Sequence, residues 1–161
     1  MKADLIAPFA LAVATLGLAA CGNHQQGSKA QQSSGPAQGV SVSDGRLVLP
    51  AVHGNPGAVY FTVHNDTNGP ATLDGAEVDG AKMAMLHAMS MVDGHTNMQE
   101  VNKMDVPAGG ELVFAPGGRH VMAMDLDDSL KPGGTTNVTL SFASGAKATF
   151  PAEILAAGNA H

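Results

Sequence analysis

The chain contains no tryptophan, one cysteine and one tyrosine, and aromatic residues make up only 4% of its 161 residues. A single cysteine excludes a disulfide framework within the chain. The shortage of large rings predicts a core built from small aliphatic side chains and methionine. Basic residues are also scarce, because eight Lys and Arg against fourteen Asp and Glu give a formal charge of −6. This balance disfavours a nucleic-acid partner.

The longest apolar run lies at the N-terminus. It extends from Leu5 to Ala20, shortly after Lys2, and is short for a membrane span. It ends in Leu18-Ala19-Ala20-Cys21, where small residues before the only cysteine resemble a bacterial lipobox. We therefore expect residues 1–20 to be a lipoprotein signal peptide and Cys21 to be lipidated. Lipidation would anchor the protein to the membrane in the periplasm or cell envelope; an ordinary signal peptide or a short anchor is the alternative.

A linker and one domain follow the cysteine. Residues 21–39 are rich in Gln, Ser and Gly and contain no run that could bury apolar surface, so we expect a flexible tether there. Short apolar or alternating runs fill residues 40–156, and their spacing of roughly 8 to 15 residues favours an all-β sandwich or barrel. Residues 157–161 are assigned to a short C-terminal tail. The sequence therefore predicts a single domain behind a tether.

Pairs of residues that contain glycine mark the candidate tight turns of this domain. Glycine and aspartate tolerate the positive φ angles that such turns require. The pairs are Asp44-Gly45, Asp93-Gly94, Gly109-Gly110, Gly117-Gly118 and Gly133-Gly134.

Methionines and histidines gather in one short stretch. If the segment that begins at Ala81 is one regular strand, side chains alternate and one face carries Met83, Met85, His87, Met89 and Met91. A turn centred on Asp93-Gly94 places Met89 opposite Met98 and leaves His87 diagonal to Met98. Farther along, a second strand carries His120, Met122 and Met124 on one face.

Imidazole and thioether groups together favour Cu(I). Zn, Mg and Ca prefer thiolate, imidazole or oxygen ligands, and a neutral ligand set suits a monovalent ion better than Cu(II). Methionine forms no disulfide, so it remains a soft ligand in an oxidising compartment. The alternative is that the methionine stripe packs in the core, because methionine fills core gaps. A histidine on each methionine-bearing face favours the metal, since a histidine in an aliphatic core needs a polar partner.

The spacing of four of these residues matches a known family. Ten residues separate His87 from Met98, twenty-one separate Met98 from His120, and one separates His120 from Met122. This arrangement, H-x10-M-x21-H-x-M, resembles the motif of the periplasmic copper chaperones of the PCu(A)C type. The stretches YFTVHN and VPAGGELVFAPGGRHVMAMDL are also similar to that family, and the resemblance covers residues 40–154.

The resemblance implies a cupredoxin-like β-sandwich that holds Cu(I) near its surface. By position, it makes His87, Met98, His120 and Met122 the copper ligands. It also implies transfer of Cu(I) to an acceptor during assembly of the CuA centre of cytochrome c oxidase. Subunit II of the oxidase and a thioredoxin-like Sco protein are the candidate acceptors. Many members carry a His- and Met-rich tail for Cu(II), whereas LAAGNAH offers only His161, so the resemblance does not extend to a second Cu(II) site.

More sulfur and nitrogen surrounds the motif than it requires, in Met85, Met89, Met91, His95 and Met124. Met89 and Met124 are candidates for supporting or relay ligands, and Met85 and Met91 are further auxiliary candidates. His53 and His64 lie in apolar strand contexts and are interpreted as structural.

Other functions remain open on the sequence alone. Blue-copper and CuA electron carriers need cysteine ligands, which the domain lacks. We expect no enzyme and no catalytic residues, because a copper enzyme needs an open coordination position and acid–base or substrate-orienting groups, whereas a neutral His/Met set is more typical of storage or transfer. Two alternatives to a copper chaperone are a membrane-tethered copper scavenger and a metal-free structural lipoprotein. We expect a monomer.

Overall fold

The structure, a computed structural model, describes residues 37–159, so the expected signal peptide, Cys21 and nearly all of the expected linker lie outside it. Its regular elements are β1 (Val40–Val48), β2 (Gly57–Asn65), β3 (Ala71–Val78), β4 (Ala81–Val92), β5 (His95–Glu100), β6 (Met104–Val106), β7 (Gly110–Phe114), β8 (His120–Leu126), β9 (Thr135–Phe142) and β10 (Lys147–Leu155). The all-β prediction is therefore confirmed. No helix among the described residues is long and apolar enough to cross a membrane.

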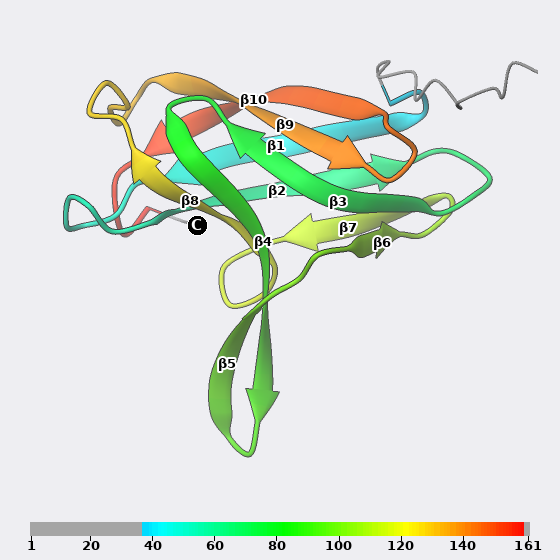
Figure 1. Ribbon diagram of the computed structural model, residues 1–161, viewed down its shortest axis with the longest axis horizontal. Coiled ribbons are helices and arrows are strands. Elements are labelled where there is room, and N and C mark those ends of the chain that lie inside the picture. The colour runs from blue at the N-terminus through cyan, green and yellow to red at the C-terminus, as the bar shows by residue number, and fades with distance from the viewer. Residues whose placement is uncertain (1–36, 160–161) are drawn as a thin grey trace, which may run out of the picture. The chain divides into compact units, whose positions relative to one another are not determined.

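The strands form one hydrogen-bonded sheet that folds over on itself (Figure 1). Its order is β5-β4-β8-β2-β1-β10-β9-β3-β6, and β7 also pairs with β2. β1 and β10 run parallel, whereas β4 is antiparallel to both of its neighbours. Phe61 on β2 contacts Phe150 on β10, although β1 separates these strands in the sheet. The two halves therefore face each other, which confirms the predicted single-domain, cupredoxin-like β-sandwich.

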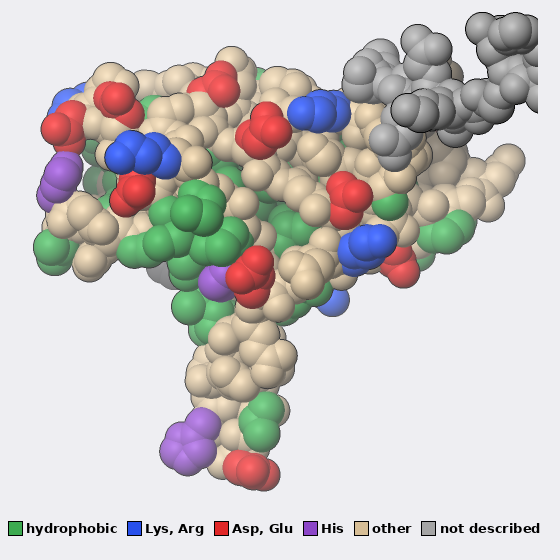
Figure 2. Space-filling model, in the orientation of Figure 1, with side chains coloured by type: hydrophobic (Ala, Val, Ile, Leu, Met, Phe, Trp, Pro, Cys, Tyr) green, Lys and Arg blue, Asp and Glu red, His purple; other side chains and the backbone are tan. Residues whose placement is uncertain are grey.

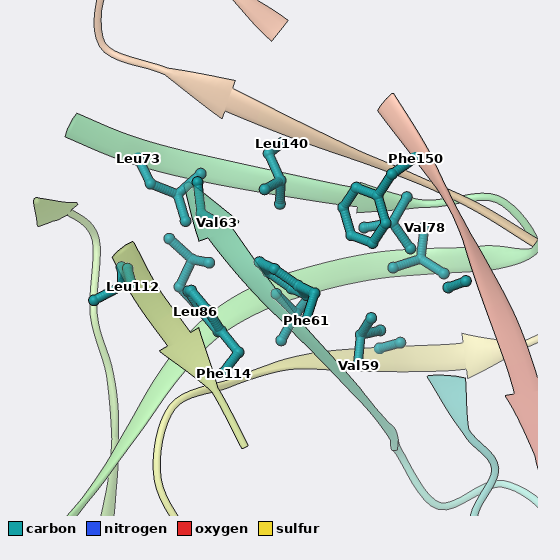
Figure 3. Packing of buried hydrophobic residues seen from close by; sticks show 14 of the residues in the cluster. Val59, Phe61, Val63, Leu73, Val78, Leu86, Leu112, Phe114, Leu140 and Phe150 are labelled. Carbon is teal, nitrogen blue, oxygen red and sulfur yellow. The ribbon is translucent and has the colours of Figure 1, made fainter. Parts of the chain in front are cut away.

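Three phenylalanine rings meet at the centre of the core (Figure 3). Phe61 stacks on Phe114 with ring centroids 4.2 Å apart, and its ring is tilted against Phe150 at 5.1 Å. Alternation along β2 buries Val59, Phe61 and Val63 on the same face. Such ring pairs contribute roughly 0.5–1.5 kcal/mol each beyond the burial of their area.

The methionines contribute little to this core, so the expected use of methionine there is wrong. Among the described methionines only Met104, on the edge strand β6, belongs to the buried cluster. Large inward positions are taken instead by Phe61, Phe114, Phe142 and Phe150. Composition states which side chains the chain contains, but alternation along each strand decides which of them face inward.

Two Asp-Gly pairs that look alike in the sequence have different structures. Asp93 and Gly94 have φ angles of 51° and 77° and form the predicted tight turn between β4 and β5. Asp44 also has a positive φ, 56°, but it lies within β1, where the register to β2 shifts between Ser43 and Arg46. The turn predicted at Asp44-Gly45 is therefore wrong, and the pair forms a β-bulge. The three Gly-Gly pairs lie in turns, as predicted.

The hairpin of β4 and β5 projects from the rest of the domain (Figure 1). Every residue from Met91 to Glu100 is exposed, whereas Leu86, in the first half of β4, is only 4% exposed. One end of β4 is therefore fixed by the core, and the other end carries its side chains out into solvent.

Replacing Phe61 with alanine tests whether the ring cluster holds the two halves together. We expect Phe61→Ala to lower the free energy of unfolding by about 3–5 kcal/mol, because both ring contacts are lost and a cavity remains. Urea unfolding followed by circular dichroism measures the change. Val113→Thr is the matched control, since Val113 is 44% exposed on β7 and its replacement should stay within about 0.5 kcal/mol. Equal effects of the two substitutions would contradict this account of the core.

Candidate metal centre

The pairing of β4 with β8 brings the predicted histidines together. His87 lies directly opposite His120, Met85 opposite Met122, and Met83 opposite Met124. These residues occupy the face of β4 that lies opposite the buried side chain of Leu86. Figure 2 shows hydrophobic side chains, the class that includes methionine, gathered over β4 and β8. The two strands therefore present one outward face of imidazoles and thioethers.

The β4–β5 turn adds Met98 to the same face. Val92 pairs with His95 across the two turn residues, and this register places Met89 directly opposite Met98. His87 lies opposite Glu100, so Met98 is its diagonal neighbour. Diagonal neighbours lie about 7–8 Å apart at their Cα atoms, which is within reach of a methionine side chain. The predicted register of this hairpin is confirmed.

Exposure separates these methionines from ordinary core residues. Met83, Met91 and Met98 are 51%, 74% and 47% exposed. Four others are half-buried, namely Met85, Met89, Met122 and Met124. The alternative that the stripe packs in the core is therefore excluded.

His120 is held in a form that can bind a metal. It is 7% exposed, and its Nδ1 lies 3.3 Å from the carbonyl oxygen of Gly118. A carbonyl can only accept, so Nδ1 carries the proton and Nε2 keeps its lone pair. Burial lowers the pKa of His120 and the nearby His87 lowers it further, while the Gly118 carbonyl acts in the opposite direction. The neutral imidazole is favoured.

His87 contains the least satisfied polar atoms of this face. Both of its ring nitrogens are shielded from solvent, and neither has a hydrogen-bond partner among the described residues. Its ring lies 5.6 Å from that of His120, centroid to centroid, at an interplanar angle of 52°. Leaving such a group unpaired costs about 1–3 kcal/mol. A metal that accepts a nitrogen ligand would relieve this cost, so the donor set fits a soft ion.

The four residues of the motif surround the histidine pair. Met98 lies towards the hairpin tip and Met122 towards the opposite end of β4, with His87 and His120 between them. Among residues 37–159, no group of three or more His, Cys, Asp or Glu side chains is placed to hold a metal. Any metal at this face would therefore depend on thioethers, which favour Cu(I) over Zn, Mg or Ca.

A row of side chains that the sequence analysis missed continues beside the histidines. Tyr60 lies next to His120, with ring centroids 6.4 Å apart, and the guanidinium of Arg46 lies 5.7 Å from the centre of the Tyr60 ring. Burial raises the pKa of Tyr60, against the opposing effect of Arg46. Alternation along AVYFTVHN places Tyr60 outward, but only the pairing of β1, β2 and β8 brings it to this site.

The remaining candidates lie elsewhere. Met91 pairs with Thr96 near the hairpin tip, away from the histidines. His53 contacts Asp128 at 2.6 Å on the surface, and His64 lies 3.0 Å from the Ser43 hydroxyl. The position of His64 in β2 agrees with its structural interpretation, whereas the strand context expected for His53 is wrong, because His53 is exposed between β1 and β2.

Comparisons with known proteins show the family of this chain. The family described as "Putative lipoprotein LpqE-like" matches residues 40–154. A protein of Leifsonia xyli subsp. xyli, "Putative lipoprotein Lxx21020", is 34% identical over 142 residues, which cover 88% of this chain and 84% of that protein.

Solved structures show the same fold. Cu(I)-DR1885 from Deinococcus radiodurans is 31% identical, with a TM-score of 0.54 over 81% of this chain and 85% of that one. The copper-bound PCuAC domain from PmoF2 is 21% identical, with a TM-score of 0.60 over 73% of this chain and 93% of that one. The chain belongs to the LpqE-like family, and its motif and fold are those of the PCu(A)C copper chaperones.

Proposed function

We propose that this protein binds Cu(I) through His87, Met98, His120 and Met122 and transfers it to an acceptor protein in the cell envelope. The observation that carries the proposal is the pair of shielded, unpartnered nitrogens of His87, which lies opposite a neutral His120 on a thioether-bearing face. Cu(I) is the common ion that this neutral, soft set suits best. The Cu(I)-bound form of the similar DR1885 supports the same cargo.

The position of Met98 suggests how the ion leaves. Met98 is 47% exposed and lies on the projecting hairpin, whereas His120 is 7% exposed. An acceptor can therefore approach from the Met98 side and replace the thioether first, while the histidines still hold Cu(I). Ligand exchange of this kind needs no free ion. Subunit II of cytochrome c oxidase, during CuA assembly, or a thioredoxin-like Sco protein is the acceptor that we propose.

A lipid anchor would place this exchange at a membrane surface. The descriptions of the LpqE-like family and of the Leifsonia xyli relative both read "Putative lipoprotein", which supports lipidation at Cys21 and a periplasmic or envelope location. The linker that we expect at residues 21–39 would let a monomeric domain reach membrane-bound acceptors.

A copper scavenger is the second candidate function. The observation that favours it is the surplus of accessible thioethers, because Met83 and Met91 are 51% and 74% exposed and lie outside the four-residue motif. A scavenger and a chaperone share the same site and differ in where the copper goes.

Loss of a ligand tests the site directly. We expect His120→Ala and Met122→Ala each to lower Cu(I) affinity by at least about 100-fold, since even outer-shell partners of a metal are worth 10–100-fold. Anaerobic titration against a competing Cu(I) chelator measures affinity, and circular dichroism checks the fold. His53→Ala is the control, because His53 pairs with Asp128 on the surface. Unchanged affinity in both ligand variants would refute the assignment.

The lowered pKa of His120 predicts how the metal-free protein responds to acid. The unfolded chain protonates this histidine near pH 6.5, whereas the folded protein keeps it neutral to lower pH. The free energy of unfolding should therefore fall as the pH drops below about 6.5 and should not depend on His120 above it. Urea unfolding at about pH 7.5 and about pH 5.5 compares wild type with His120→Gln. Between these two pH values the wild type should lose more free energy of unfolding than His120→Gln. An equal loss in both proteins would contradict burial of a neutral His120.

Deletion of the gene separates delivery from scavenging. If the protein delivers copper, the mutant should have low cytochrome c oxidase activity in copper-poor medium, and added copper should restore it. A mutant with normal oxidase activity and increased copper sensitivity would instead identify a scavenger. Oxidase activity in membranes and growth across a copper series measure both, with a His53→Ala strain as the matched control, because that substitution leaves the four proposed ligands and the core in place.

A further inference from the structure

The thioether pairs on β4 and β8 continue beyond the four-residue motif. Met85 lies directly opposite Met122, and the next outward pair along the strands is Met83 with Met124. Directly opposite residues have Cβ atoms about 4.5–5.5 Å apart. Ala81 and Leu126 form a pair beyond them and end the run of sulfurs. Two adjacent cross-strand pairs of methionines therefore lie on one face.

Packing does not explain this concentration of methionine. The inward face of the same strands is filled by Ala84, Leu86, Val121 and Ala123, which belong to the core or pack against it. Met83 is 51% exposed, and Met85 and Met124 are half-buried. Burial therefore gives no reason for three sulfurs at these positions, whereas the affinity of thioethers for Cu(I) does.

We propose that Met83, Met85 and Met124 form a second Cu(I) position, made only of sulfur, beside the His/Met site. The inference rests on the proposed function, since it takes Cu(I) as the cargo. Three neutral thioethers suit Cu(I) and offer nothing to Zn, Mg or Ca. Met85 of the second position is paired with Met122 of the His/Met site, so the two positions are adjacent. The protein can therefore carry two ions on one face.

The two positions fill in a definite order. Binding at the His/Met site relieves the unpartnered nitrogens of His87, which are shielded from solvent. The thioethers of Met83, Met85 and Met124 include no such orphaned group, and Met83 is 51% exposed. The first Cu(I) therefore enters the His/Met site, and the second enters the sulfur-only position.

Stoichiometry in matched variants tests the second position. The full-length chain is purified in detergent with Cys21→Ser in every sample, so that its only thiol cannot bind Cu(I). The test variant is Met83→Leu/Met124→Leu, which keeps side-chain volume and therefore the fold. The control is Met91→Leu, because Met91 is an exposed methionine on the same strand that pairs with Thr96 instead of a sulfur.

Anaerobic Cu(I) titration against a chelator should give two equivalents for wild type and Met91→Leu, and one for the double variant. X-ray absorption should show nitrogen and sulfur for the first equivalent and only added sulfur for the second. Two bound equivalents in the double variant would overturn the second position and leave the proposed function intact. The same conclusion follows if wild type and both variants bind one equivalent and His120→Ala binds none. No uptake by wild type would overturn both.

Discussion

Strand β4 is hydrogen-bonded along both edges, to β5 and to β8, and the arrangement of the site depends on this double pairing. Each ladder fixes the register of β4, and a slip of one residue would exchange its two faces. The burial of Leu86 opposes such a slip, because the imidazole of His87 would then point into the core. The register that buries the aliphatic face of β4 therefore also places the histidines and thioethers on its outward face.

Charged side chains flank the two histidines of the face. Across the sheet, Arg46 lies beside Tyr60, Tyr60 beside His120, and His87 between His120 and Glu100. The charged groups stand at the two ends of this row, and Tyr60 and the two histidines lie between them. A centre made of imidazoles and thioethers favours Cu(I), because these soft, uncharged donors suit a divalent ion less well.

Local signals in the sequence predict the hairpin and the motif well. Alternation places Met89, His87 and Met85 on one face, and Asp93-Gly94 fixes the turn that brings Met98 opposite Met89. Long-range pairing is what the sequence does not reveal. Tyr60 and Arg46 reach the site only through β1 and β2, and Asp44-Gly45 becomes a bulge because β1 continues beyond it. Composition also cannot say which side chains face inward, and the shortage of aromatic residues therefore predicts methionine in a core that phenylalanines fill instead.

The projecting hairpin gives this protein two levels of stability. Residues 91–100 are exposed throughout, so separating the tip of β5 from β4 disrupts hydrogen bonds and few buried contacts. Segments of this kind open locally at a much lower free energy than global unfolding requires. Met98 lies on such a segment, whereas His120 lies on a strand whose neighbours reach the phenylalanine core. Fraying of the tip can therefore release one thioether while the sandwich, and both histidines, remain folded.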